Sequence, residues 1–242
     1  MRLLFIRHAD PDYKNDSLTE VGKKKANALA EFLSKEEIDA IFVSPLGRAK
    51  ETLAAYLQSS KTLVKPITKD WLREFNANAR HDATHSAWDF LPSTLEEAGD
   101  DAYSPKAYLT SIAAYKNSDF KEKYDNVAAH LDELLSSFGY LREKHHYKVI
   151  EENTKTIAFF CHFGVEAMMI SHLINSSPIT LCQHFCALPS SITTIYTEER
   201  RKGIAQFRIT EFGSVSHLLC KGMTPSFSAR FSETYSDPRR HD

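Results

Sequence analysis

Four short apolar segments of the chain each end at a polar or charged turn. They cover residues 3–6, 38–43, 64–67 and 156–161. Apolar runs of this length, bounded by turn residues, are typical of strands that are buried on both faces of a parallel sheet. The pattern therefore predicts at least four strands, each with polar residues at its carboxyl end.

Helical periodicity separates these predicted strands. The sequence Ser17-Leu18-Thr19-Glu20 is typical of a capping box, and the helix that it opens is expected to run to about residue 36. Its apolar positions are Val21, Ala26, Leu29, Phe32 and Leu33. A second helix is predicted over residues 49–57, with Leu53, Ala54 and Leu57 facing inward. Strand, helix and strand over this length predict a right-handed βαβ unit with parallel strands.

The second half of the chain continues the alternation. The most regular apolar stripe consists of Phe120, Tyr124, Val127, Leu131, Leu134 and Phe138, spaced three or four residues apart as on one face of a helix. A helix at 165–174 follows the last buried strand, and a short helix is expected near 181–186. Two strands, 191–197 and 204–210, are predicted to form a hairpin through residues 200–203.

Other segments are less regular. Residues 142–148 are interpreted as a basic connector, 215–218 as an edge strand, and the tail after Gly222 as loosely ordered. Residues 76–118 carry too few aliphatic side chains for a core of their own, with short helices expected at 86–90 and 105–115. We therefore expect one domain, residues 1–242, with an insertion at about 76–118 whose aromatic side chains either line a pocket or anchor the insertion.

Composition excludes several classes of protein. The chain has 242 residues and a formal net charge of −2, which argues against a general nucleic-acid binder. No apolar run is long enough to cross a bilayer, and the opening run is too short for a secretory signal, so a cytoplasmic location is expected. The four cysteines do not suggest a disulfide framework. Cys182, His184 and Cys186 lack the spacing of a zinc site, which favours free thiols.

Candidate chemistry lies where the predicted strands end. Arg7 and His8 follow the first strand, Arg48 lies in the first turn of the second helix, Glu74 follows the third strand, and His162 follows the strand at 156–161. The carboxyl ends of parallel strands meet at one edge of a sheet, where α/β proteins bind ligands. Guanidinium groups bind phosphate oxygens, and a neutral imidazole nitrogen can attack phosphorus. The pattern favours a phosphate site.

These segments resemble a known family. In order and spacing, residues 4–9, 44–52, 72–74 and 160–164 are similar to the motifs of the histidine phosphatase superfamily, which includes phosphoglycerate mutases. The resemblance implies a three-layer α/β/α, phosphoglycerate mutase-like fold with a mostly parallel central sheet and an inserted helical or loop cap. It also implies that His8 becomes phosphohistidine, that Arg7, Arg48 and His162 bind the phosphoryl group, and that Glu74 donates the proton. Neither a metal nor another cofactor is expected.

The implied roles are chemically consistent. Arg7, Arg48 and a protonated His162 would surround the phosphoryl oxygens with positive charge. The same charges disfavour a proton on His8 and keep a lone pair available near neutral pH. Partial burial would raise the pKa of Glu74 so that it can protonate the leaving alkoxide.

Departures from the family pattern leave alternatives open. Ala9 replaces a glycine, and Phe163 replaces a small residue, which would narrow the pocket or favour an apolar substrate. Lys14 and Asn15 stand where an asparagine is expected to contact phosphate. The segment 75–81 lacks the tract of a mutase, which favours a phosphatase.

The expected ligand is a small phosphorylated substrate or inorganic phosphate, while substrate identity and oligomeric state stay open. The alternatives are a phosphoglycerate mutase-type phosphotransferase, a non-catalytic phospho-ligand binding module and, last, a metallohydrolase built on His81, His85 and the Cys182 region.

Overall fold

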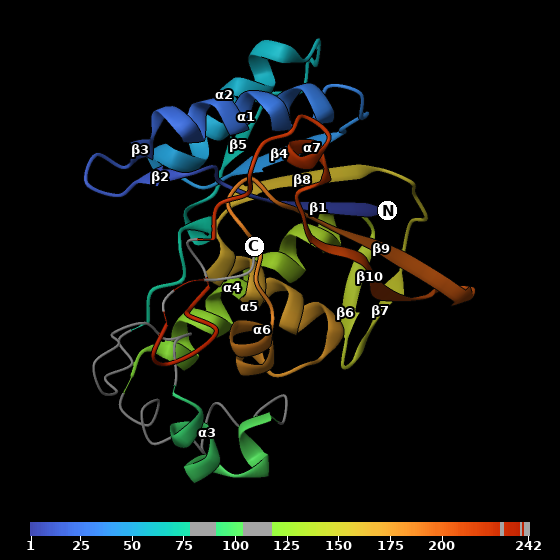
Figure 1. Ribbon diagram of the computed structural model, residues 1–242. Coiled ribbons are helices and arrows are strands. Elements are labelled where there is room, and N and C mark those ends of the chain that lie inside the picture. The colour runs from blue at the N-terminus through green and yellow to red at the C-terminus, as the bar shows by residue number, and fades with distance from the viewer. Residues whose placement is uncertain (78–90, 104–117, 228–229, 238, 240–242) are drawn as a thin grey trace.

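The structure is a computed structural model, and it describes residues 1–77, 91–103, 118–227, 230–237 and 239 (Figure 1). Its centre is a mixed sheet with the strand order β5-β4-β8-β1-β9-β10-β7-β6. The strands span Arg2–Arg7 (β1), Ala40–Val43 (β4), Ile67–Thr68 (β5), Tyr140–Glu143 (β6), His146–Val149 (β7), Thr156–Cys161 (β8), Ile192–Arg201 (β9) and Ile204–Ser214 (β10). A separate two-stranded ladder joins β2 (Pro11–Asp12) to β3 (Ser17–Leu18).

Helices cover both faces of the parallel half of the sheet. Helices α1 (Glu20–Leu33) and α2 (Gly47–Ser59) lie on one side, and α4 (Phe120–Ser137), α5 (Phe163–Ile174) and α6 (Pro178–His184) on the other (Figure 1). Strand β1 explains this arrangement, because Leu3 and Phe5 join the core with α4 and α5 while Leu4 and Ile6 join the core with α1 and α2. The predicted three-layer α/β fold is confirmed.

The sheet changes character at β1. Strands β5, β4, β8 and β1 are parallel, whereas every pairing from β1 through β9, β10 and β7 to β6 is antiparallel. The sheet is therefore mixed and not mostly parallel as predicted, because residues 142–148 are no connector: they belong to the antiparallel hairpin of β6 and β7. Most residues of this hairpin are polar, so the sequence did not reveal that buried and exposed positions alternate along it, with Tyr140 and Tyr147 in the core.

The predicted helical stripe on α4 is confirmed, since Phe120, Tyr124, Val127, Leu131 and Leu134 are buried and Phe138 packs partly buried against the same core. The predicted hairpin is also present, as β9 and β10.

Other details of the prediction are wrong. Thr19, and not Ser17, is the N-cap of α1 and accepts from the backbone N–H of Gly22. The buried stripe of α1 contains Gly22, Ala26, Leu29 and Leu33. Val21 and Phe32 directly precede Gly22 and Leu33 of that stripe. Because one residue corresponds to about 100° of rotation around the helix, both side chains point away from the core and are exposed.

Ala54 and Leu57 on α2 were predicted to face inward and are exposed as well, whereas Leu53 is buried. The predicted third strand, 64–67, is shorter and later, as β5. Residues 215–218 form no edge strand, because α7 (Ser216–Leu219) starts there.

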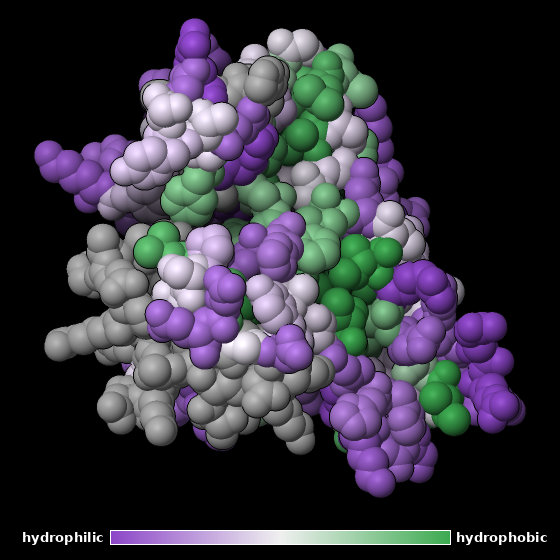
Figure 2. Space-filling view, turned by 60° about the horizontal axis from the view of Figure 1, so that its bottom comes forward, coloured by the Kyte–Doolittle hydropathy of each residue, from purple (hydrophilic) through white to green (hydrophobic). Residues whose placement is uncertain are grey.

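The described part of the insertion, residues 91–103, contains α3 (Pro92–Ala98) and the 3₁₀ turn η2 (Asp100–Tyr103). The helices predicted at 86–90 and 105–115 lie outside the described residues. A second 3₁₀ turn, η1 (Asp70–Leu72), leads into Glu74. On the face in Figure 2, hydrophilic side chains predominate at the periphery, with smaller hydrophobic patches between them. Among the described helices, none combines the length and apolar character needed to cross a membrane.

Candidate active site

The polar residues that follow β1 and β8 meet at the carboxyl edge of the parallel strands. The register pairs Arg7 with Cys161, and the backbone N–H of His8 donates to the carbonyl of Cys161 over 3.0 Å. The rings of His8 and His162 are consequently neighbours, with their centroids 5.0 Å apart. One ligand atom from each of His8, His162 and Glu74 lies within 4.8 Å of the others.

His8 is held as a neutral imidazole. Its Nδ1 lies 2.7 Å from the carbonyl oxygen of Ala9, which can only accept, so Nδ1 carries the hydrogen. Its Nε2 accepts from Nε of Arg48 over 3.3 Å. Burial, followed by the charge of Arg7, lowers the pKa of His8 to about 3. The lone pair of Nε2 is therefore available throughout the neutral pH range.

Ala9 does not obstruct this site. Its methyl group packs in a small core cluster with Leu18 and Ala26, away from solvent. Its backbone N–H donates to Oγ1 of Thr52 over 3.0 Å, and the Thr52 hydroxyl donates to the carbonyl of Arg48 over 2.8 Å. Thr52, the last residue of the motif at 44–52, thus links the end of β1 to the first turn of α2, a role that the sequence analysis did not assign.

Arg48 reaches the site from the first turn of α2. Its Nη1 donates to Oδ1 of Asp16 over 2.7 Å, and Oδ2 of Asp16 accepts from the backbone N–H of Gly47 over 2.7 Å. The loop that carries Asp16 approaches so closely that a Cβ on Gly47 would lie 2.0 Å from the carbonyl oxygen of Asp16. The ring of Tyr13 lies 5.4 Å from the guanidinium carbon of Arg48.

Two other residues of this loop were predicted to contact phosphate. The side chains of Lys14 and Asn15 are exposed, and the Asn15 amide donates to Asp12 over 2.7 Å. The structure therefore shows Asp16, which the sequence analysis missed, as the loop residue that forms an ion pair with Arg48. The only sequence signal was its position between the first motif and the α1 cap.

Arg7 is the last residue of β1 and directly precedes His8. Its Nη1 donates to the carbonyl oxygen of Ala187 over 2.5 Å, and its guanidinium carbon is 6.0 Å from the ring centroid of Phe163. Phe163 is the first residue of α5 and is buried. The phenyl ring is therefore part of the wall beside Arg7, where a smaller residue would leave space.

His162 is buried and neutral. Its Nε2 lies 2.8 Å from Oγ of Ser44, which itself accepts from the backbone N–H of Leu46 over 3.2 Å. Burial and then the nearby His8, Arg48 and Arg7 hold the pKa of His162 far below its usual value. The prediction of a protonated His162 is wrong for the protein without substrate, because removal of the ring from water disfavours its cation.

Glu74 is anchored beside these rings. Its Oε1 accepts from the backbone N–H groups of Gly164 and Phe75 over 2.9 and 3.0 Å. Burial raises the pKa of this carboxyl, while Arg7 and the two backbone donors act in the opposite direction. The balance favours a carboxyl that holds a proton more strongly than an exposed glutamate.

The site carries more positive than negative charge. His8, Glu74 and His162 form the one group in the described part of the chain with donor types and spacing that could hold a metal ion. However, the guanidinium groups of Arg7 and Arg48 adjoin it, and their charge favours an anion over a cation. His81 and His85, considered as metal ligands from the sequence, lie outside the described residues.

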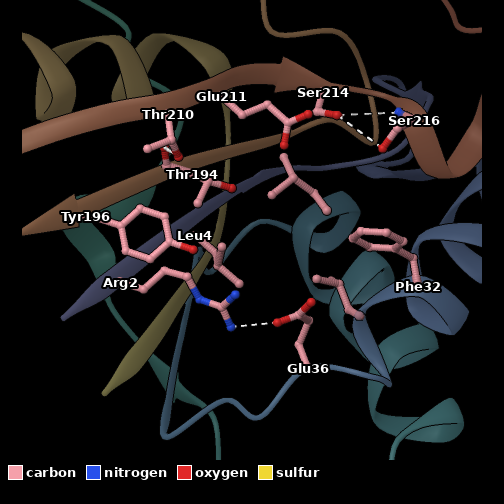
Figure 3. Close-up of a pocket in the computed structure, with 12 residues that line it drawn as sticks. Arg2, Leu4, Phe32, Glu36, Thr194, Tyr196, Thr210, Glu211, Ser214 and Ser216 are labelled. Carbon is pink, nitrogen blue, oxygen red and sulfur yellow. Dashed lines mark hydrogen bonds and ion pairs between the residues drawn. The ribbon is translucent and has the colours of Figure 1, made fainter. Parts of the chain in front are cut away.

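A cavity of about 390 Å³ lies at the end of β1 away from His8, between α1 and the strands β9 and β10 (Figure 3). Two of its three charged lining residues are paired with each other, since Nη2 of Arg2 donates to Glu36 over 2.6 Å, and the third is Glu211. Arg2 begins β1 and Arg7 ends it. This cavity is therefore separate from the group around His8.

A neutral imidazole beside two guanidiniums, at the carboxyl edge of an α/β sheet, is an arrangement suited to binding phosphoryl groups. The sequence model of the histidine phosphatase superfamily (branch 1) matches residues 3–210, and the chain belongs to this superfamily.

Relatives support the same assignment. A probable phosphatase of Schizosaccharomyces pombe (strain 972 / ATCC 24843) is 24% identical over 234 residues, which cover 90% of this chain and 95% of the relative. A mycobacterial glucosyl-3-phosphoglycerate phosphatase in complex with inorganic phosphate has a similar fold, with a TM-score of 0.59 and 19% identity. The match covers 89% of this chain and 98% of that protein. The structure of a phosphoserine phosphatase of Entamoeba histolytica matches with a TM-score of 0.58 and 19% identity, over 90% of this chain and 98% of that protein. The predicted superfamily and phosphatase class are confirmed.

Proposed function

We propose that this protein hydrolyses small phosphomonoesters through a phosphohistidine intermediate on Nε2 of His8, with no metal. The observation that carries the proposal is the pair of contacts on the His8 ring. Nδ1–H is bound to the carbonyl of Ala9, while Nε2 accepts from Nε of Arg48. The tautomer therefore puts the lone pair of the ring on Nε2, and a guanidinium that can bind phosphate lies within hydrogen-bond distance of it.

Charge would bind the substrate at this point. Arg7 and Arg48 supply two guanidiniums, and the amino end of α2 adds the positive end of its helix dipole. Phosphoryl transfer depends mainly on positioning and on stabilisation of the equatorial oxygens. The two arginines suit that task without a metal ion.

His162 would contribute as a neutral donor. Because Oγ of Ser44 accepts from Leu46, its own hydroxyl hydrogen is free to donate to Nε2 of His162. That tautomer leaves the hydrogen on Nδ1 of His162, which has no partner within the described residues. A hydrogen bond from Nδ1–H to a phosphoryl oxygen would satisfy it.

The first step forms a bond between Nε2 of His8 and phosphorus while the ester P–O bond breaks. The departing alkoxide takes the proton of the Glu74 carboxyl and leaves as an alcohol. In the second step Glu74, now a carboxylate, accepts a proton from water as the water oxygen attacks phosphorus. The P–N bond breaks, its electron pair returns to Nε2, and phosphate is released.

A small phosphorylated compound is the substrate class that fits this site, and inorganic phosphate would bind as the product. Phe163 would limit the space beside Arg7 and favour an apolar or compact group there. Direct contacts of Lys14 and Asn15 with phosphate stay a prediction, since their exposed side chains would have to turn toward the ligand.

The test compares the wild type with His8→Ala on an aryl phosphate in the presence of EDTA. We expect the wild type to turn over and the variant to lose at least about 10³-fold in kcat. The exposed His145 offers a matched control, and His145→Ala should keep the wild-type rate. Acid quench of the wild type should trap an acid-labile phosphoryl group that His8→Ala lacks. Full activity of His8→Ala, or activity abolished by EDTA, would overturn the proposal.

A further inference from the structure

Glu166 is a buried carboxyl that the proposed reaction does not use. It lies in the first turn of α5 and is 1% exposed. Neither carboxyl oxygen has a hydrogen-bond partner of ordinary geometry in the part of the chain that the structure describes. The hydroxyl of Thr193 is close enough to lower its pKa, but a carboxylate buried without an ion-pair partner is still costly, so this side chain needs a physical explanation.

The groups around Glu166 belong to the phosphate site or adjoin it. Three of these groups change the pKa of Glu166. The side chain of Thr193 on β9 and the guanidinium of Arg7 at the end of β1 lower it, and Glu74 after η1 raises it. On β8, burial and then the charge of Glu166 raise the pKa of the Cys161 thiol. On α6, burial and the charge of Glu74 raise the pKa of the Cys182 thiol.

The balance of these groups keeps Glu166 uncharged at neutral pH. Burial raises its pKa to about 8, Glu74 adds to the rise, and Thr193 and Arg7 oppose it. A protonated Glu166 cannot neutralise Arg7. This matters because Arg48 has Asp16 as an ion-pair partner, whereas no ion pair of Arg7 occurs among the described residues.

Arg7 has a donor to spare for such a pair. Its Nη1 is bound to Ala187, but its buried Nε has no hydrogen-bond partner in the described structure. If Glu166 ionises, the nearby guanidinium would be attracted to it, and the interaction would be strong in a low-dielectric interior. The same negative charge would repel a phosphate dianion.

We propose that Glu166 is a positioning residue for Arg7 that keeps the guanidinium free for phosphate while protonated and withdraws it from phosphate when ionised. The inference rests on the proposed function, in which Arg7 binds the phosphoryl group. By linkage, bound phosphate must also favour the protonated form of Glu166.

The experiment measures KM for an aryl phosphate and the Kd of inorganic phosphate from pH 6.5 to 9.5. In the wild type, loss of one proton should raise KM up to tenfold per pH unit above about pH 8, with a smaller change in kcat. Glu166→Gln, which resembles the protonated acid, should match the wild type at pH 6.5 and lose most of the alkaline rise. Glu122→Gln, an exposed substitution on α4, is the control and should behave as wild type.

The outcomes separate the two proposals. If the wild type and Glu166→Gln show the same alkaline rise in KM and Kd, the role of Glu166 is refuted while the phosphatase proposal stands. If neither protein binds phosphate at pH 6.5, the proposed function itself fails. Should Glu166→Gln not fold, Glu166→Met, which also lacks an ionisable group, provides the same comparison.

Discussion

The hydroxyl of Thr52 should be required for both stability and catalysis. It accepts from the backbone N–H of Ala9 and donates to the carbonyl of Arg48, and its side chain is buried. Thr52→Val has nearly the same shape but removes the hydroxyl. The change therefore leaves the Ala9 N–H buried with no acceptor, while it creates almost no cavity.

The size of the effect follows from these contacts. A buried donor without a partner costs about 1–3 kcal/mol of unfolding free energy. For a chain of this length each kcal/mol lowers Tm by about 2–4 °C, so a central value of 2 kcal/mol gives about 4–8 °C. Ala9 also supplies the carbonyl that holds Nδ1–H of His8. We therefore expect kcat to fall about tenfold or more while KM changes little, because the nucleophile loses orientation.

Thermal unfolding and steady-state kinetics on an aryl phosphate check this prediction, with Thr52→Ser as the matched control. Serine keeps the hydroxyl and loses one methyl group, worth about 0.8 kcal/mol, so Thr52→Ser should retain kcat. The reasoning is refuted if Thr52→Val keeps the wild-type kcat, or if Thr52→Ser loses as much kcat as Thr52→Val.

Two further predictions concern protons. Glu74→Gln should slow an alkyl phosphate at least about tenfold more than p-nitrophenyl phosphate, because only the poor leaving group needs a proton; equal slowing would exclude Glu74 as the acid. Acid should destabilise the fold: His8 and His162 have lowered pKa values, so below about pH 6.5 the unfolded chain binds protons that the folded chain does not. Tm should fall from pH 6.5 toward 4, less steeply in His8→Asn, and an identical slope in that variant would contradict the assignment of a neutral His8.

The sequence allowed the frame of the site to be predicted. Parallel strands present their carboxyl ends at one edge, so Arg7, His8 and His162 were expected together, and the structure brings them together. The helical stripe of α4 was equally readable, because its spacing depends on local periodicity alone. Glu74 was placed by its position after a predicted strand, although that strand proved to be shorter.

Features that depend on tertiary contacts could not be read in this way. Asp16 and Glu166 are unremarkable in local sequence, and Thr52, although it ends the motif at 44–52, was given no role of its own. The importance of all three comes from partners or from burial that only the fold creates. The charge of His162 was misjudged for the same reason, since the extent of burial decides it. The hairpin of β6 and β7 was missed because its exposed positions outnumber the two buried tyrosines.

The pairing of β1 with β8 has a consequence for how activity is acquired during folding. These strands come from opposite halves of the chain, and residues as far apart as Arg2 and Thr156 must meet before the two histidine rings become neighbours. Long-range pairings of this kind are slow to form. A collapsed intermediate with α1, α2 and α4 in place would still be inactive. The return of turnover in a refolding time course would therefore report the pairing of β1 with β8.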